Sequence, residues 1–276
     1  MSSRYLLVLP LALALGCDDP ESGPLQTDRN AFTYSAHMQG ERTLYLRNGR
    51  GVIDVEPSAD DTLRIEADIS WRGGPERPDG VYLSANPTAD GILVCSKFGE
   101  GTCTVEDYGI KGGRGNPFSS RGLRVAYRVK VPAGVKLDLI GVDTRITSAS
   151  TAPVKAQSVN GDVTVVTAVG PVRASTINGD VDARMTTLAG GDSVVVSSLN
   201  GEAWVFLPET AAFTADLATT NGRVESDFPS LAGGSASRKS IDGAINGGGR
   251  VVHVRTLNGR VGVGRLDAEG RSYQRP

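Results

Sequence analysis

The chain has 276 residues and a formal net charge of -2, with 29 basic and 31 acidic residues. Whole-chain basicity is the usual mark of nucleic-acid binding, so this balance predicts no nucleic-acid partner. Glycine is the compositional outlier at 35 residues, and the scarcity of histidine (only His37 and His253) argues against His-rich metal sites and most His-based catalysis.

Residues 1–17 have the form of an export signal. Arg4 precedes an apolar run that is typical of a signal-peptide core and too short for a membrane span of about 20 residues. The run ends in Ala-Leu-Gly-Cys, which resembles the lipobox of bacterial lipoproteins. That resemblance implies lipidation of Cys17 and a membrane anchor at the periplasmic face or the cell surface. The alternative is an ordinary cleaved signal peptide.

The segment after this signal is expected to lack structure at first and then to form strands. Residues 18–30 are polar and rich in Asp, Pro and Gly, which predicts a flexible tether. Residues 43–70 alternate apolar and polar side chains, which predicts three strands with turns at Asn48-Gly49 and at 58–61.

Cys95 and Cys103 flank a glycine-bearing turn between two short strand-like runs. Strands joined by such a loop bring two Cα atoms within bridging range, and export permits disulfides. The sequence therefore predicts a structural Cys95–Cys103 disulfide. A redox pair is the weaker alternative, because redox chemistry prefers Cys-x-x-Cys near a βαβ unit.

The second half of the chain is a repeat of about 20 residues built on the dipeptide Asn-Gly. An apolar residue usually precedes the Asn, and period-2 alternation follows the Gly, as in SVNGDVTV and TINGDVDA. Asn-Gly is a strong turn signal, and the alternation predicts a strand with one buried face. The predicted repeat turns are Asn160-Gly161, Asn178-Gly179, Asn200-Gly201, Asn221-Gly222, Asn246-Gly247 and Asn258-Gly259.

The repeat length decides between a meander of hairpins and a wound solenoid. About 20 residues hold two or three short strands, which is one coil of a β-solenoid, and the small Val, Ala and Thr side chains suit its narrow core. We expect a mostly β protein: a single-domain β-solenoid over residues 31–270, with 31–140 as its N-terminal β cap and 141–270 as its repeats. Stacking predicts that Asn160, Asn178, Asn200 and Asn221 occupy successive rungs about 5 Å apart.

Several motifs resemble a known family. VPAGVKLDL, the NGDV units, LPETAAFTADLATTNGRVESD and INGGGRVVHVRTLNGRVGV are similar to the bacterial putative-adhesin families of unknown function. The resemblance covers roughly residues 40–265. It implies a β-solenoid related in appearance to autotransporter adhesin heads, implies adhesion by analogy, and brings no catalytic residues.

The residues that follow each Asn-Gly form one candidate site. Asp162, Asp180 and Glu202 come first, and Arg223 and Arg260 follow in the later units. If rungs stack, the three carboxylates run along one edge. Turns favour Asp for local reasons, so a solvated polar edge is the expected reading. A cation site and a polysaccharide-cutting carboxylate cluster are the alternatives.

Trp204 and Phe206 form another candidate site. Both alternate with inward-facing residues, so we expect them to point outward. An exposed pair would contact a sugar or a protein. Large exposed apolar patches are uncommon, so we favour the alternative that a neighbouring loop or the 105–122 insert covers the two rings.

These features favour a non-catalytic, envelope-anchored binding or structural module that uses no cofactor and no metal. Its expected partners are the membrane, through the lipid anchor, and an envelope protein or polysaccharide. A polysaccharide-acting β-helical enzyme and a scaffold that self-associates end to end are the competing hypotheses.

Overall fold

The computed structural model describes residues 24–77, 79–110, 122–188, 194–228 and 232–266, and this part of the chain is all β. The signal segment and Cys17 lie outside these residues. In the described part, no helix has the length and apolar character that crossing a membrane requires. The strands are β1 Leu25–His37, β2 Thr43–Pro57, β3 Thr62–Arg72, β4 Val81–Pro87, β5 Gly91–Phe98, β6 Thr102–Cys103, β7 Tyr108–Gly109, β8 Arg124–Val131, β9 Lys136–Ser150, β10 Val154–Asn160, β11 Val163–Thr167, β12 Val172–Asn178, β13 Val181–Met185, β14 Val194–Asn200, β15 Ala203–Pro208, β16 Phe213–Asn221, β17 Val224–Ser226, β18 Ala232–Ala236, β19 Ser240–Ile245, β20 Arg250–Asn258 and β21 Val261–Leu266.

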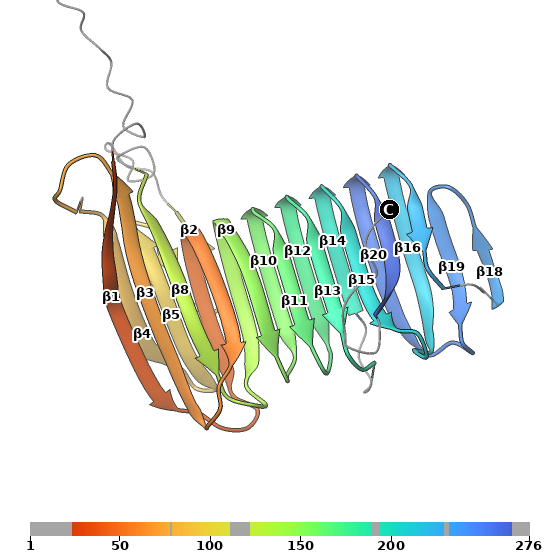
Figure 1. Ribbon diagram of the computed structural model, residues 1–276, viewed down its shortest axis with the longest axis horizontal. Coiled ribbons are helices and arrows are strands. Elements are labelled where there is room, and N and C mark those ends of the chain that lie inside the picture. The colour runs from red at the N-terminus through yellow and green to blue at the C-terminus, as the bar shows by residue number, and fades with distance from the viewer. Residues whose placement is uncertain (1–23, 78, 111–121, 189–193, 229–231, 267–276) are drawn as a thin grey trace, which may run out of the picture.

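The strands stack into two faces that meet along one edge (Figure 1). β2 and β9 run without interruption through that edge and take part in both faces. Face A stacks in the order β4, β5, β2, β9, β10, β12, β14, β20, β16, β19, β18. Face B stacks in the order β1, β3, β8, β2, β9, β11, β13, β15, β21, β17.

The repeats form a β-solenoid, as predicted. Each Asn-Gly unit contributes one strand to face A and one to face B, and equivalent strands of successive rungs pair in parallel and in register. Asn160 pairs with Asn178, and Asn178 pairs with Asn200. Parallel neighbours lie about 4.8 Å apart, so identical frames stack directly above one another.

The predicted order of rungs is wrong at its last step. Asn200 pairs with Asn258, and Asn258 pairs with Asn221, so the final unit of the chain lies between the third and fourth units. Its strands β20 and β21 pair with β14 and β15 on one side and with β16 and β17 on the other. The near-identical frames would accept either neighbour, so alternation alone does not determine the stacking order.

The same interleaving occurs at the other end of the solenoid. β2 comes early in the chain, yet it lies between the rung of β5 and β8 and the rung of β9. β2, β5 and β8 are therefore rungs, and the predicted division into a cap over 31–140 and repeats from 141 is wrong in this respect. Antiparallel strands cap the stack instead: β4, β3 and β1 at one end, and β19 and β18 at the other.

Two predicted turns and part of the tether also differ from expectation. β2 runs straight through Asn48-Gly49, which lies at the shared edge of the two faces. Asn246-Gly247 does not join the Asn column, because it forms the turn between β19 and β20 and the Asn246 amide donates to the carbonyls of Glu209 and Ala211. Residues 25–30, predicted as tether, are part of β1; an exposed edge strand does not need apolar alternation.

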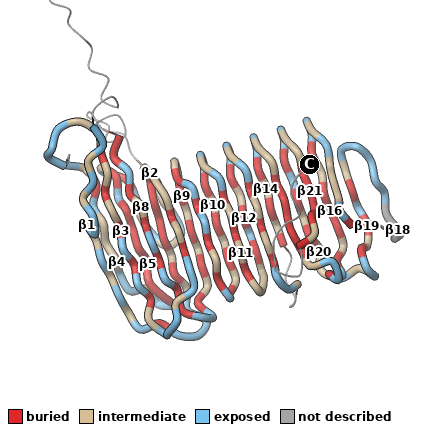
Figure 2. The backbone as a smooth tube through the Cα atoms, viewed as in Figure 1, coloured by how far each residue is buried: buried red, intermediate tan, exposed pale blue. Residues whose placement is uncertain are grey.

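The core is a stack of small side chains. Along β11, β13, β15 and β21 the inward residues are fully buried. Figure 2 shows buried and less buried residues alternating along β11 and β13, whereas β15 and β21 are buried at nearly every position. Larger buried side chains, including Phe98 and Tyr127, lie at the end of the stack formed by β5 and β8. The repeat section is therefore rigid and regular, and its outward side chains form straight rows.

Candidate binding surfaces

The five column asparagines form a continuous amide ladder along the shared edge, which we call the Asn edge. The ladder runs in the order Asn160, Asn178, Asn200, Asn258, Asn221. From Asn178 onward, each Nδ2 donates to the Oδ1 of the asparagine before it in this order, at 2.7–2.9 Å. Two positions before each asparagine, a buried hydroxyl donates to a carbonyl of the rung below, as Ser198 does to Gly179 at 2.8 Å. The Asn edge is therefore braced by side chains and carries little free hydrogen-bonding capacity.

The glycine after each asparagine permits this close stacking. Gly179 and Gly201 have φ angles of 143° and 148°. A Cβ on Gly201 would lie 1.9 Å from the carbonyl oxygen of Gly179. Both the backbone conformation and the inter-rung distance therefore require glycine.

The residues that follow these glycines form a row on face B, which we call the charge row. The rung order makes it run Asp162, Asp180, Glu202, Arg260, Arg223. Arg260 forms an ion pair with Glu202 at 2.7 Å, and this hydrogen-bonded contact raises the pKa of Arg260.

The acidic members of the charge row bind backbone. Asp162 Oδ1 accepts the N–H of Asp180 at 2.9 Å, and Asp180 Oδ1 accepts the N–H of Glu202 at 2.8 Å. Among the described residues, no three His, Cys, Asp or Glu side chains gather as a metal site would require. The row is thus a structural polar edge with a separation of charge along its length.

Trp204 and Phe206 point away from the solenoid core, as predicted, but they are not exposed ligand contacts. They are 4% and 2% exposed, and their rings stack with centroids 5.8 Å apart. On the neighbouring strand β21 the facing residues are Gly262 and Gly264, whose missing side chains leave room for the two rings. The Arg184 guanidinium lies 5.7 Å from the Phe206 ring centroid. The pair is a second, small core on the outside of face B.

An aliphatic row lies beside the Asn edge on face A. It contains one residue from each of four adjacent rungs, immediately before the asparagine, and each is about two-fifths exposed. These residues are Val159, Ile177, Leu199 and Leu257. The row gives face A a straight apolar margin about three rung spacings long.

A trough of about 510 Å³ lies on the outer surface of face B. It crosses β3, β8, β2, β9 and β11, where the capping strands meet the solenoid. Thr147, Ala149 and Val166 contribute its weakly polar part. Its charged lining is formed by Arg64, Arg128, Lys130, Asp54, Glu56 and Glu66.

The charges of this trough are only partly satisfied within the protein. Arg128 binds Asp68 at 2.7 Å, and this hydrogen-bonded contact lowers the pKa of Asp68. Lys130, Asp54 and Glu56, in contrast, form no side-chain hydrogen bond or ion pair with the described part of the chain. In the trough, the basic residues of β8 therefore lie beside the acidic residues at the C-terminal end of β2, and both sets include a charge without a partner among the described residues.

Sequence reasoning missed the trough because its lining comes from five strands that are distant in the chain. The sequence feature that could have indicated the trough is the charge at the outward positions of β8 and β2, where Arg128 and Lys130 face Asp54 and Glu56. Only the interleaved position of β2 brings those positions together.

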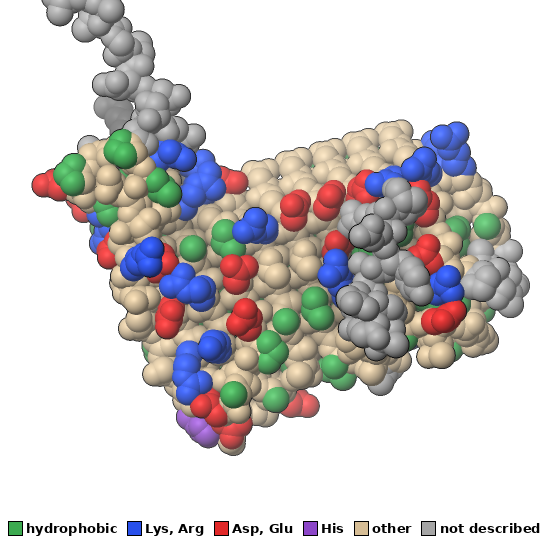
Figure 3. All heavy atoms as spheres, in the orientation of Figure 1, with side chains coloured by type: hydrophobic (Ala, Val, Ile, Leu, Met, Phe, Trp, Pro, Cys, Tyr) green, Lys and Arg blue, Asp and Glu red, His purple; other side chains and the backbone are tan. Residues whose placement is uncertain are grey.

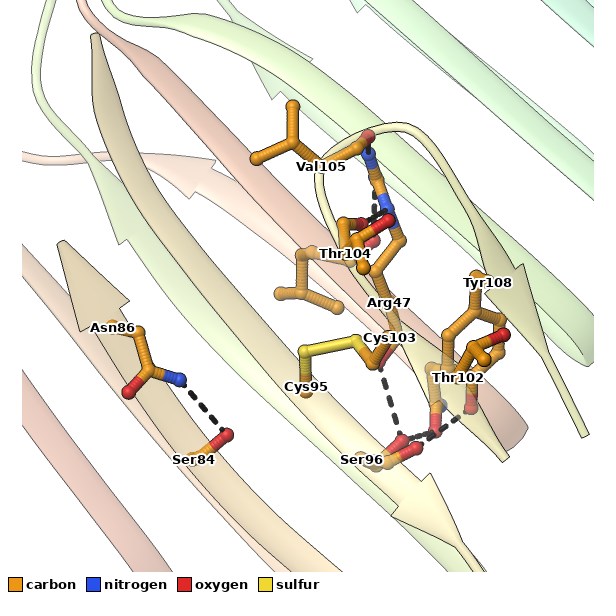
Figure 4. The surroundings of a disulfide bond; sticks show 12 residues. Arg47, Ser84, Asn86, Cys95, Ser96, Thr102, Cys103, Thr104, Val105 and Tyr108 are labelled. Atoms are coloured by element: carbon orange, nitrogen blue, oxygen red, sulfur yellow. Dashed lines mark hydrogen bonds between the residues drawn. A yellow bond between two sulfur atoms is a disulfide. The ribbon is translucent and has the colours of Figure 1, made fainter. Parts of the chain in front are cut away.

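The predicted disulfide between Cys95 and Cys103 is confirmed. It ties the short β6–β7 hairpin to β5. Arg47 of β2 contacts the same segment through hydrogen bonds to its backbone carbonyls (Figure 4). The fully buried Arg47 guanidinium donates to Asp138 Oδ1 at 2.8 Å and to the carbonyl of Val105 at 2.6 Å. Burial lowers the pKa of Arg47, and the Asp138 carboxylate opposes this effect.

Comparison with known proteins gives one family match. A family model described as Toastrack DUF4097 matches residues 126–263. A comparison with curated proteins finds no match.

Three solved structures share a low similarity with this chain. A putative cell adhesion protein from Clostridium sporogenes is 13% identical, with 85% of this chain and 99% of that chain covered and a TM-score of 0.49. Putative adhesins from Bacteroides fragilis and Parabacteroides distasonis are 8% and 10% identical. They cover 89% and 88% of this chain, and 99% and 98% of their own, with TM-scores of 0.28 and 0.27. Likenesses this low assign neither fold nor function.

Proposed function

We propose that this chain, which belongs to the Toastrack DUF4097 family, is an adhesin-like, non-catalytic binding module, exported and anchored by lipid at the bacterial cell envelope. The observation that carries the binding role is the trough on face B, where Lys130, Asp54 and Glu56 have no side-chain partner in the part of the chain that the structure describes. A rigid solenoid is a suitable support for such a site, because its strands fix the spacing of the outward charges.

Two features support export and anchoring. The segment up to Cys17 has the sequence of a lipoprotein signal, and the Cys95–Cys103 disulfide suits an oxidising compartment. Expression of the chain in a bacterium with labelled palmitate tests the anchor. The protein should carry label and sediment with membranes, and Cys17→Ser should abolish both. A labelled Cys17→Ser variant would contradict the proposal, and so would an unlabelled wild type.

The mixed charge of the trough points to a charged polymer of the envelope, either a polysaccharide or an extended protein segment. Free charges desolvated by a partner discriminate strongly between matched and mismatched ligands. We commit to the polysaccharide, because the weakly polar part around Ala149 and Val166 offers a sugar chain an uncharged surface between the two charged strands.

Binding to three immobilised polysaccharides tests this choice: alginate (anionic), chitosan (cationic) and dextran (neutral). The wild type should bind a charged polymer and not dextran. If the wild type binds alginate, Lys130→Glu should weaken that binding at least tenfold. If it binds chitosan, Glu56→Lys should weaken that binding at least tenfold. The control Arg173→Glu reverses an exposed charge on face A, away from the trough, and should leave binding unchanged. Binding that none of these changes affects, or no binding at all, would contradict the proposal.

A polysaccharide hydrolase is the alternative that the trough itself raises, since Asp54, Glu56 and Glu66 all line it. Hydrolysis needs a proton donor and a base or nucleophile placed on either side of the scissile bond. Release of reducing ends from the bound polymer distinguishes the two functions. The binding module releases none, whereas release that Asp54→Asn abolishes would establish the enzyme.

A further inference from the structure

The charge row has a polarity that the chain order hides. Because β21 lies between β15 and β17, Arg260 follows Glu202 directly, and Arg223 comes next. The row therefore splits into an acidic block and a basic block. Figure 3 shows acidic and then basic side chains along the upper part of this face toward the C-terminal end of the stack.

The basic block surrounds a shallow hollow of about 440 Å³. Its charged lining is formed by Arg223, Arg238 and Arg260 together with the carboxylate of Glu202. Gly222 and Gly259 also line it and have no side chains to fill it. Arg260 is paired with Glu202 and Arg223 with Glu225. The Arg238 side chain has no hydrogen bond or ion pair with the described residues.

The acidic block keeps free capacity as well. Asp162 and Asp180 each use Oδ1 to accept a backbone N–H, and no described group binds their Oδ2 atoms. Arg145 precedes Asp162 in the row, so a basic residue bounds the acidic block at its other end. Among the described residues, the acidic block thus keeps a free carboxylate oxygen on each aspartate, and the basic hollow keeps one unpaired arginine, Arg238. The two lie on a single straight row, about three rung spacings apart.

We propose that this row docks a second copy of the same chain in antiparallel orientation. A two-fold axis midway along the row places the acidic block of each copy on the basic hollow of the other, so that both contacts form at once. The carbonyl of Arg238 accepts the N–H of Val224 at 3.0 Å, so Arg238 lies one step beyond Arg223 along the row. With the axis between Glu202 and Arg260, Asp180 faces the second copy's Arg223 and Asp162 faces its Arg238. A parallel copy would set like charges opposite each other, so the row also selects orientation.

This contact leaves the other surfaces free. The trough lies where the capping strand β3 meets the rung strand β8, at the opposite end of face B from the basic hollow, and contributes nothing to the row. Side-by-side pairing also differs from end-to-end stacking, because it uses outward side chains and no backbone hydrogen bonds.

Sedimentation of the full chain at two salt concentrations tests the proposal. At about 0.01 M salt the Debye length is about 30 Å and the wild type should have twice the monomer mass, whereas at about 1 M it should be monomeric. One variant carries Asp162→Lys and Asp180→Lys, and a second carries Arg223→Glu and Arg238→Glu. Each should be monomeric alone at low salt. Their equimolar mixture should regain the dimer mass, because each reversed block meets its complement.

A variant that folds less stably would also fail to form the dimer. Recovery of the dimer mass in the mixture shows that both variants are folded, so the test stays decisive. Lys130→Glu, in the trough, should leave the dimer unchanged, which separates this proposal from the proposed function. A wild type that is monomeric at low salt would overturn the proposal, and so would a dimer that survives both reversals. A monomer retained on alginate until Arg238→Glu is introduced would show that the basic hollow binds a free polyanion instead.

Discussion

The glycine after each column asparagine is the position where an added methyl group should change the stability of the fold most. At Gly201 a side chain meets two obstacles: a φ of 148° and a carbonyl oxygen 1.9 Å from the position of Cβ. At Gly247 the φ is 92° but nothing lies within 4 Å. The two positions therefore separate conformational strain from inter-rung contact.

We expect Gly201→Ala to lower the free energy of unfolding by about 3 kcal/mol and Gly247→Ala by about 1 kcal/mol, from backbone strain with and without the added clash. Urea titration followed by circular dichroism measures both. Equal losses at the two positions would show that contact between rungs contributes nothing.

At the residue scale, predictions that depend on local chemistry are confirmed, and those that depend on a neighbour distant in the chain are not. The alternation correctly directed Trp204 and Phe206 outward, but their burial depends on Gly262 and Gly264, which lie 58 positions further along the chain. The dipeptide Asn246-Gly247 predicts a repeat turn but forms the turn between β19 and β20, because Asn-Gly favours any tight turn and not only those of the Asn column. Local chemistry was readable from the sequence, whereas the neighbour across the rung was not.

At the scale of strands, β2 takes part in both faces and also supports the β6–β7 hairpin through its Arg47 side chain. Arg47 is the only charged side chain among the described residues that is fully buried, and it holds Thr104, Val105 and Asp138. The disulfide fixes one point of the hairpin, at Cys103, and the guanidinium fixes the next two residues.

Arg47→Met should therefore cost about 3 kcal/mol, the order expected when one partner of a buried charged contact is removed. The loss should appear as faster hydrogen exchange at residues 102–109, with the disulfide still closed. Lys136→Met removes an exposed pair with Glu41 and should cost at most about 1 kcal/mol. Unchanged exchange at 102–109 would mean that the disulfide alone holds the hairpin.

Strand identity was largely predictable from the sequence, and strand order was not. The frames around Asn160, Asn178 and Asn200 gave the strands, the inward side chains and the edge, because each follows from alternation and turn chemistry. The positions of β2 and β20 depend on pairing energies among nearly equivalent rungs, and those differences are invisible in the pattern. The trough and the polarity of the charge row both follow from that order, so neither could be inferred.

At the scale of the whole molecule, antiparallel strands close both faces of the described stack at the N-terminal end and face A at the C-terminal end. β19 covers the edge of β16 at the C-terminal end, with β18 outside it. An open parallel edge is a template for further strands, so this hairpin protects against end-to-end growth.

Replacing residues 229–248 by the four-residue turn Ala168–Pro171, which joins two neighbouring rungs, should expose β16. We expect concentration-dependent fibres that bind thioflavin T. The same deletion with Thr214→Lys and Ala218→Lys, on the exposed edge, should suppress them. A monodisperse deletion variant would indicate that β16 is not a competent edge.

The order of rungs is the central claim, and crosslinking across the Asn edge tests it directly. In a Cys17→Ser background, the pair Asn200→Cys and Asn258→Cys places two Cα atoms about 4.8 Å apart, within disulfide range. The pair Asn200→Cys and Asn221→Cys lies two rungs apart, about 9.6 Å, and is out of range. Mass spectrometry of the oxidised, folded protein should find the 200–258 disulfide and no 200–221 disulfide. A 200–221 disulfide without a 200–258 one would restore the chain order and contradict the interleaved solenoid.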